Sequence, residues 1–318
     1  MTVMPLSLPK ASNKFTYIML SEALSSGSIV INEVSEGGSV PELIARNTGK
    51  VPVLIMDGEE LAGAKQNRVA NTSILVPPLS KIVIPVSCTE SGRWNYSSAD
   101  FADSDVVMSR NIRAKKNVSV SENLQACHSF RSDQGEVWSE IDREIHESGA
   151  SSHTSAMKDA HEQLRKSLGD YTGAFPYVEG QHGMIVYIGG KPAGIELLSD
   201  AGCFQQVHEK LIRSYAMEAR RSRNTGKEPS EEDLRIFPDK ITAASVNPYR
   251  SPGMGEDHRI SGEEITGSAL VCEDSVIHLT VFAIEETAHE RQADGQNPIS
   301  MESMARRRNR MRDSRFVF

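Results

Sequence analysis

The chain has 318 residues, of which 38% are hydrophobic and 25% charged, and its formal net charge is −8. This composition is typical of a globular protein, and no apolar run approaches the roughly 20 residues that cross a bilayer. The segment Met1–Lys10 lacks the basic and apolar regions of a secretory signal, so we expect a cytoplasmic protein without membrane contact. The four cysteines form no C-x-x-C pair, which favours inert thiols over a zinc or redox site.

Positive charge is concentrated near the C-terminus. The stretch Ala305–Arg315 holds six arginines and one aspartate, a local charge of +5, which leaves −13 for the rest of the chain. An acidic body argues against a broad nucleic-acid-binding face. Residues 286–318 show no apolar period, so we expect a basic, disordered tail that folding does not need and that attracts nucleic acid weakly. Residues 1–285 are then expected to form a single α+β domain.

The N-terminal part of the chain predicts short strands rich in β-branched residues and separated by turn signals. Closely spaced strands of this kind favour antiparallel sheets in a β-sandwich-like arrangement, with helices packed on them. The fold class is therefore α+β. The early strands are expected at Phe15–Leu20, Ser28–Glu33, Val40–Arg46, Val51–Met56, Ser73–Val76 and Lys81–Val86.

Helices and strands are mixed after Trp94. Asp133 and Glu136 have the form of a capping box that opens a helix, and Asp200 caps another. A third helix is expected over Thr154–Leu168, while Tyr96–Leu124 and Arg220–Asp233 show no clear period and predict irregular segments. The later strands are expected at Met184–Ile188 and Ala193–Leu198, which form a hairpin, and at Ile241–Val246, Glu264–Leu270 and Val276–Ala283.

The densest polar run directly follows the strand Val51–Met56. Loops at strand ends are where a rigid scaffold presents reactive groups. Carboxylates beside a lysine and an arginine can transfer protons or hold a phosphate-bearing ligand. The alternative is a surface hairpin whose charges cancel one another. The candidates are Asp57, Glu59, Glu60, Lys65, Gln66, Asn67 and Arg68, with Asn71 just beyond.

Two further runs add candidates. Glu90 and Arg93 follow the strand Lys81–Val86 and can complete a charged pocket with Trp94 as a stacking wall; the alternative is a strand end anchored by one tryptophan. Since both polar runs follow apolar strands, the two strands are expected in the same β unit, with the runs close together. Asp257 and Arg259 lie in a glycine-rich stretch without the context of a dinucleotide fingerprint, but can contact a polar ligand. No metal-ligand spacing is present, and the sequence specifies no cofactor.

The string from Gly58 to Trp94, GEELAGAKQNRVANTSILVPPLSKIVIPVSCTESGRW, closely resembles the signature of the ARPP domain, the ARG and Rhodanese-Phosphatase-superfamily-associated Protein domain. The resemblance spans Phe15 to Phe282 as one domain. Later segments that fit the same pattern are Ser132–Gln134 with Val137-Trp138, Leu211–Ala219, Gly253–Arg259, Gly267–Leu270 and Val276–Leu279.

This resemblance implies a setting of RNA-repair and phage-conflict operons, and a proposed role in processing damaged RNA ends or ADP-ribosylated nucleotides. The leading hypothesis is a nucleotide- or RNA-end-directed processing factor. The alternative is a non-catalytic module that binds a nucleotide signal or a partner protein. Whether the chain is an enzyme stays open at this point, as does its oligomeric state.

Each candidate residue has a role in the leading hypothesis. Glu59, Glu60 or Glu90 serves as a general base or metal-binding carboxylate, and Lys65 and Arg68 hold a phosphate. Gln66, Asn67 and Asn71 read ribose or base edges. Catalysis requires Glu59 or Glu60 in a concave pocket within one ligand's reach of the basic residues, whereas a flat, open loop favours binding.

Overall fold

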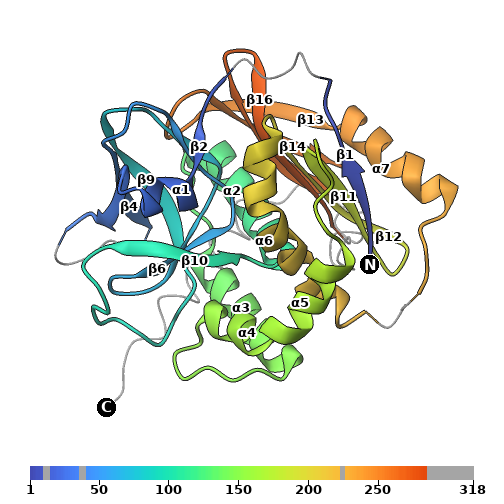
Figure 1. The fold of residues 1–318 in the computed structure, drawn as a ribbon, viewed down its shortest axis with the longest axis horizontal. Coiled ribbons are helices and arrows are strands. Elements are labelled where there is room, and N and C mark those ends of the chain that lie inside the picture. The colour runs from blue at the N-terminus through green and yellow to red at the C-terminus, as the bar shows by residue number, and fades with distance from the viewer. Residues whose placement is uncertain (10–14, 36–40, 223–225, 285–318) are drawn as a thin grey trace, which may run out of the picture. The chain divides into compact units, whose positions relative to one another are not determined.

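Side chains alternate between the two faces of a strand, and here the strands assemble into three sheets that bury one or both faces (Figure 1). The computed structural model describes residues 1–9, 15–35, 41–222 and 226–284, and Met1–Ile284 forms one compact unit. The pairs between named strands are antiparallel except for one short parallel pair, β2 with β5. The predicted α+β class with antiparallel sheets is confirmed. The basic tail lies outside the described residues.

The largest sheet joins the N-terminal strand to strands from the second half of the chain. Its order is β1-β11-β12-β16-β15-β14-β13. β11 and β12 form the predicted hairpin, with Gly189 and Gly190 both at positive φ in its turn. The strands are β1 (Thr2–Leu6), β11 (Gly183–Ile188), β12 (Lys191–Leu198), β13 (Ser245–Arg250), β14 (Glu256–Gly262), β15 (Ile265–Cys272) and β16 (Ser275–Ala283).

The other two sheets pack face to face as a small sandwich. The six-stranded sheet has the order β10-β6-β7-β9-β4-β3, and the three-stranded sheet has the order β2-β5-β8. One apolar core lies between them, with Val53 and Ile74 from the smaller sheet and Leu43 and Ile84 from the larger. The strands are β2 (Ile18–Met19), β3 (Ile29–Glu33), β4 (Glu42–Asn47), β5 (Val53–Ile55), β6 (Glu59–Gly63), β7 (Arg68–Ala70), β8 (Ile74–Val76), β9 (Ser80–Cys88) and β10 (Phe101–Val107).

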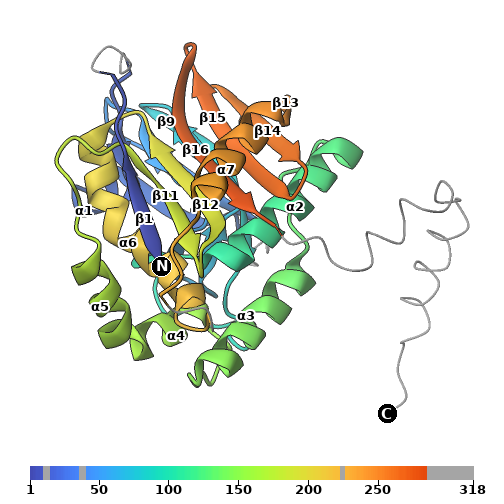
Figure 2. The same ribbon diagram turned by 90° about the vertical axis from the view of Figure 1, so that its right-hand side faces the viewer.

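Helices cover both faces of the seven-stranded sheet. Helix α6 (Ala201–Ala219) begins at its predicted cap, where Asp200 Oδ1 accepts a hydrogen bond of 2.8 Å from the Cys203 amide. Its apolar face packs between β11 and the three-stranded sheet (Figure 1). Helix α7 (Glu231–Ala243) packs on the opposite face of the sheet through Phe237 (Figure 2). Because both faces are covered, β11 is buried along almost its whole length.

A second group of helices covers the outer face of β6 and β7. Helices α2 (Arg110–Cys127), α3 (Gln134–Ser148) and α4 (Met157–Gln163) share a core with Val69 of β7. Helix α3 begins as predicted, because the Asp133 side chain accepts a hydrogen bond from the Glu136 amide. Helix α1 (Leu20–Ser25) and helix α5 (Arg165–Ala174) complete the set.

Several predicted elements were wrong. Tyr96–Leu124 is not irregular but holds β10 and most of α2, whose inward residues include Arg113 and Lys116 in place of apolar ones. The loop predicted at Arg220–Asp233 is correct for its described residues up to Ser230, but its last three residues begin α7, which also covers the start of the strand predicted at Ile241–Val246. Helix α7 buries only Phe237, so its apolar signal is weak.

Other elements differ in their limits. The helix expected over Thr154–Leu168 breaks at Leu164 (φ −90°, ψ 3°) into α4 and α5. The strand expected at Phe15–Leu20 shrinks to Ile18–Met19 before α1. The strands expected at Val51–Met56 and Lys81–Val86 share one core and belong to the same sandwich, as predicted, although they lie in its two different sheets.

Candidate functional site

The polar run after Met56 is built into the six-stranded sheet. It forms β6, a turn, and the start of β7, with Leu61 opposite Arg68. Neither the expected loop nor the surface hairpin is therefore correct. Among the predicted site residues only Trp94 is exposed, while Lys65 and Arg93 are partly buried. The buried ones are Asp57, Glu59, Glu60, Gln66, Asn67, Arg68, Asn71, Glu90, Asp257 and Arg259.

Arg68 is buried, and three of its five N–H groups have no hydrogen-bond partner among the described residues. Its side chain has 0% exposure, and Nη1 donates to Gln66 Oε1 at 3.1 Å and to the Asn67 carbonyl at 3.5 Å. Nη2 lies 3.6 Å from Glu33 Oε1, which is an ion pair without a hydrogen bond. Within the described part of the chain, Nε and Nη2 of Arg68 and both carboxylate oxygens of Glu33 have no hydrogen-bond partner.

Two exposed aromatic rings lie beside Lys65, and one of them, Trp94, is also close to Arg68. Trp94 is 45% exposed and Tyr96 53%, and Lys65 Nζ lies 5.3 Å and 5.2 Å from their ring centroids. The Arg68 guanidinium carbon lies 5.8 Å from the Trp94 ring centroid. Both cations are within the range of a cation–π interaction. We call Glu33, Lys65, Arg68, Trp94 and Tyr96 the Arg68 cluster.

Glu90 and Arg93 join the β6–β7 turn to the segment after β9. Arg93 is 2.6 Å from Glu90 Oε2 and donates to the Ala64 carbonyl at 2.8 Å and to Asn67 Oδ1 at 3.1 Å. Glu90 also accepts from the Asn67 amide and from Thr154 Oγ1. Burial alone would raise the pKa of Glu90, but hydrogen bonds from Arg93 and Thr154 lower it overall. These contacts hold the turn that carries Lys65.

Glu60 is near Glu90 but faces away from Arg68. Since Glu60 pairs with Val69 and Arg68 with Cys88, alternation puts Glu60 on the helix-covered face and Arg68 on the other. Thr89 Oγ1 donates to Glu60 Oε1 at 2.5 Å. Burial raises the pKa of Glu60 to about 7. The two polar runs do meet, as expected, but the sheet separates Glu60 from the predicted phosphate-binding arginine.

Glu59 belongs to a separate ion-pair group. Lys210 Nζ of α6 lies 3.4 Å from Glu59 Oε1 and 2.7 Å from Asp103 Oδ2. Burial raises the pKa of Glu59, and Lys210 opposes that shift without reversing it. These contacts tie α6 to the six-stranded sheet.

Asp57 lies at the centre of a fully buried charged network. It pairs with Lys116 Nζ and with Arg113 Nε at 3.4 Å, and Arg113 pairs with Glu196 at 2.7 Å. His278 Nε2 is 3.7 Å from Glu196. Burial alone would raise the pKa of Asp57, but Lys116 and Arg113 lower it overall. We call these five residues the Asp57 cluster.

The remaining candidates border this cluster. Lys116 Nζ donates to the carbonyls of Ala70 at 3.1 Å and Asn71 at 3.0 Å. Asp257 pairs with Arg259 at 2.7 Å and accepts from Thr72. Burial lowers the pKa of Lys116, and Arg259 adds to that shift. Asp57, Asn71, Asp257 and Arg259 are thus brought together, away from Lys65 and Trp94.

Sequence reasoning missed the partners of Asp57. Arg113 and Lys116 fell in a segment predicted as irregular. A signal did exist for Glu196, because a carboxylate in the middle of the apolar strand Ala193–Leu198 requires a buried partner.

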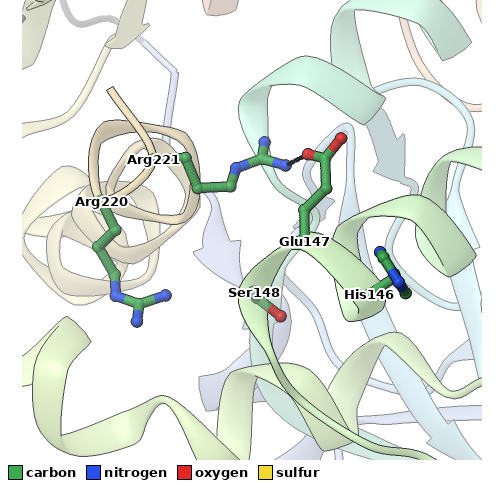
Figure 3. A pocket seen from close by; sticks show the side chains of 5 residues that line it. All are labelled: His146, Glu147, Ser148, Arg220 and Arg221. Atoms are coloured by element: carbon green, nitrogen blue, oxygen red, sulfur yellow. Dashed lines mark hydrogen bonds and ion pairs between the residues drawn. The ribbon is translucent and has the colours of Figure 1, made fainter. Parts of the chain in front are cut away.

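A surface hollow lies elsewhere, at the C-terminal ends of α3 and α6 (Figure 3). Its volume is about 600 Å³, none of the predicted residues lines it, and its Arg221 is paired with Glu147. Among the residues that the structure describes, no three His, Cys, Asp or Glu side chains are grouped to hold a metal ion. Over the same residues, no helix has the length and apolar character that spanning a membrane requires.

One family model covers nearly the whole compact unit. The family model of the ARG and Rhodanese-Phosphatase-superfamily-associated Protein domain, ARPP-1, matches residues 1–282. The chain belongs to the ARPP-1 family. No curated protein and no solved structure matches it. The ARPP-1 match contains all three sheets and both clusters, and the family description associates the domain with ARG and Rhodanese-Phosphatase-superfamily proteins.

Proposed function

We propose that this ARPP-1 protein binds a nucleotide or a phosphorylated RNA end at the Arg68 cluster, as a component of RNA-repair or phage-conflict systems. The observation that carries the proposal is the exposed pair Trp94 and Tyr96, whose ring centroids lie 5.3 Å and 5.2 Å from Lys65 Nζ, with the Arg68 guanidinium carbon 5.8 Å from the Trp94 ring centroid. Aromatic rings stack on bases, and neighbouring cations attract phosphate. An acidic chain with a small basic–aromatic patch suits a short ligand better than a long RNA track.

Binding is better supported than catalysis at this patch. Glu59 and Glu60 are completely buried, Glu60 faces the opposite side of the sheet from Arg68, and Glu59 is engaged by Lys210. A general base must reach the proton that it removes, directly or through one water. We therefore favour the interpretation that the site is a recognition module for phosphorylated or ADP-ribosylated nucleotides.

The proposal can be tested with tryptophan fluorescence. The chain has two tryptophans, so Trp138→Phe leaves Trp94 as the only indole reporter. Stacking of a base on Trp94 is expected to quench its emission during titration with nucleoside monophosphates and 5′- or 3′-phosphorylated oligoribonucleotides. Lys65→Ala in the same background should weaken binding ten- to a hundredfold, since one charge-assisted contact contributes about 1.5–3 kcal/mol.

The matched control is Lys81→Ala, which removes an exposed lysine from β9, outside the cluster. Arg68→Ala should abolish binding, but it leaves Glu33 buried without its cation, so its melting temperature must be measured alongside. Equal affinities for the reporter protein and its Lys65→Ala variant would contradict the proposal. Product analysis with ADP-ribosylated and end-phosphorylated RNA, with and without divalent metal, tests for turnover; turnover that Glu60→Gln abolishes would favour the enzyme instead.

A further inference from the structure

Glu33 is a buried carboxylate whose surroundings do not satisfy it. It ends β3, its side chain is 5% exposed, and neither oxygen accepts a hydrogen bond from any described residue. The nearest cation is Arg68 Nη2 at 3.6 Å, beyond the 2.7–3.2 Å of a normal N–H···O bond. A buried ion pair offsets its desolvation only with close geometry and further hydrogen bonds. Both groups therefore keep capacity for a ligand.

The unused groups form a specific pattern. Glu33 offers two acceptors side by side, and Arg68 offers two donors, Nε and Nη2. Among the Watson–Crick edges of the four RNA bases, only that of guanine places two adjacent donors, N1–H and the 2-amino group, next to an acceptor, O6. Adenine and cytosine each present one donor group, and uracil presents a single donor between two acceptors.

We propose that Glu33 is the specificity-determining residue of this site and that it selects guanine by accepting hydrogen bonds from N1–H and the 2-amino group. This inference rests on the proposed nucleotide-binding function. Arg68 donates to O6, Trp94 stacks on the base, and Lys65 attracts the phosphate. Because Arg68 has no exposed surface, the indole of Trp94 must move away from the guanidinium as the base enters.

The same pair of donors can come from a second source, the 2′,3′-diol of a terminal ribose. The ligands are therefore GMP, IMP, AMP and 2′,3′-dideoxy-GMP, titrated against the wild-type protein and Glu33→Gln. IMP lacks the 2-amino group, AMP lacks both of the guanine donors N1–H and 2-amino, and the dideoxy compound lacks the diol. The control is Glu42→Gln, which removes one negative charge from the neighbouring strand β4.

The wild-type protein should bind GMP and its dideoxy analogue equally, and each at least tenfold more tightly than IMP or AMP. Glu33→Gln should weaken GMP binding ten- to a hundredfold and leave AMP binding unchanged or slightly tighter, because a negative charge near the phosphate is lost. Glu42→Gln should keep the wild-type preference. Each variant is checked by its melting temperature.

Three outcomes overturn guanine selection by Glu33, a fourth refutes the function on which it rests, and the four can be told apart. Unchanged or tighter GMP binding by Glu33→Gln would make Glu33 only a counterion of Arg68. If Glu33→Gln weakens the binding of GMP and AMP alike and does not change the binding of 2′,3′-dideoxy-GMP, the Glu33 carboxylate binds the ribose diol and not the base. Equal affinity of the wild-type protein for GMP, IMP and AMP refutes guanine selection even if Glu33→Gln does not fold. No binding of any nucleotide refutes the proposed function itself.

Discussion

The Asp57 cluster provides a test of how this fold is held together. Asp57→Asn keeps the size of the side chain but removes the charge that faces Lys116 and Arg113. Arg113 retains Glu196, whereas Lys116 retains, among the described residues, only the carbonyls of Ala70 and Asn71. The variant therefore carries an uncompensated cation where the side chains have 0% exposure.

Breaking a buried ion pair from one side costs about 3–5 kcal/mol, a large share of the roughly 5–15 kcal/mol that stabilises a typical domain. We expect Asp57→Asn to lower the free energy of unfolding in urea by that amount. The double variant Asp57→Asn with Lys116→Met removes both charges and should be more stable than Asp57→Asn alone. Glu162→Gln breaks the exposed i,i+4 pair with Lys158 and should change stability by no more than about 0.5 kcal/mol. A loss below about 1 kcal/mol for Asp57→Asn, or no recovery in the double variant, would refute this account of the cluster.

Three further predictions concern other parts of the fold. Burial raises the pKa of Glu60 to about 7, above its ordinary value of 4.5, so the protonated carboxyl stabilises the folded state. This stabilisation is lost as pH rises through about 7. Glu60→Gln should therefore flatten the fall in the free energy of unfolding measured between about pH 5 and 8. At Gly58 (φ +79°) a Cβ would lie 2.7 Å from the Arg113 side chain, so Gly58→Ala should lower the free energy of unfolding in urea by about 1–3 kcal/mol. The control is Gly173→Ala in α5, which should be neutral or stabilising because the space around its Cβ is open. Ending the chain after Ile284, the limit of the compact unit, should leave the melting temperature unchanged, and a drop of several degrees would contradict this.

The parts of the fold with local signals were predictable. The β11–β12 hairpin has two apolar runs around a Gly-Gly turn, and α3 and α6 have an aspartate cap followed by an apolar face. Helix α2 had no such signal, because its inward face carries Arg113 and Lys116. These cations can be buried because they pair with two carboxylates elsewhere in the chain, Asp57 and Glu196 on β12. Periodicity of apolar residues cannot reveal a helix whose packing depends on ion pairs with distant strands.

The candidate site was predictable in part for the same reason. The density of polar residues from Asp57 to Arg68 correctly marked an unusual segment, and the expected proximity of Glu60 and Glu90 was correct. The run could not show which residues share a face, because the sheet register decides that, and it places Glu60 and Arg68 on opposite faces. Glu33 carried no signal of its own, since an acidic residue at a strand end is common on protein surfaces.

The pairing of β1 with β11 has a consequence for how the chain folds during synthesis. Thr2 lies opposite Tyr187, and β12, the next strand of the sheet, pairs with β16 near the end of the compact unit. At about 5–20 residues per second, β1 waits roughly ten to forty seconds for its partner to leave the ribosome. The two-sheet sandwich can form in that interval from strands that are close in sequence. Assembly of the seven-stranded sheet is then the slow step, because it pairs strands that are far apart in sequence. Until β11 is synthesised, β1 is the strand most exposed to aggregation or to chaperone binding.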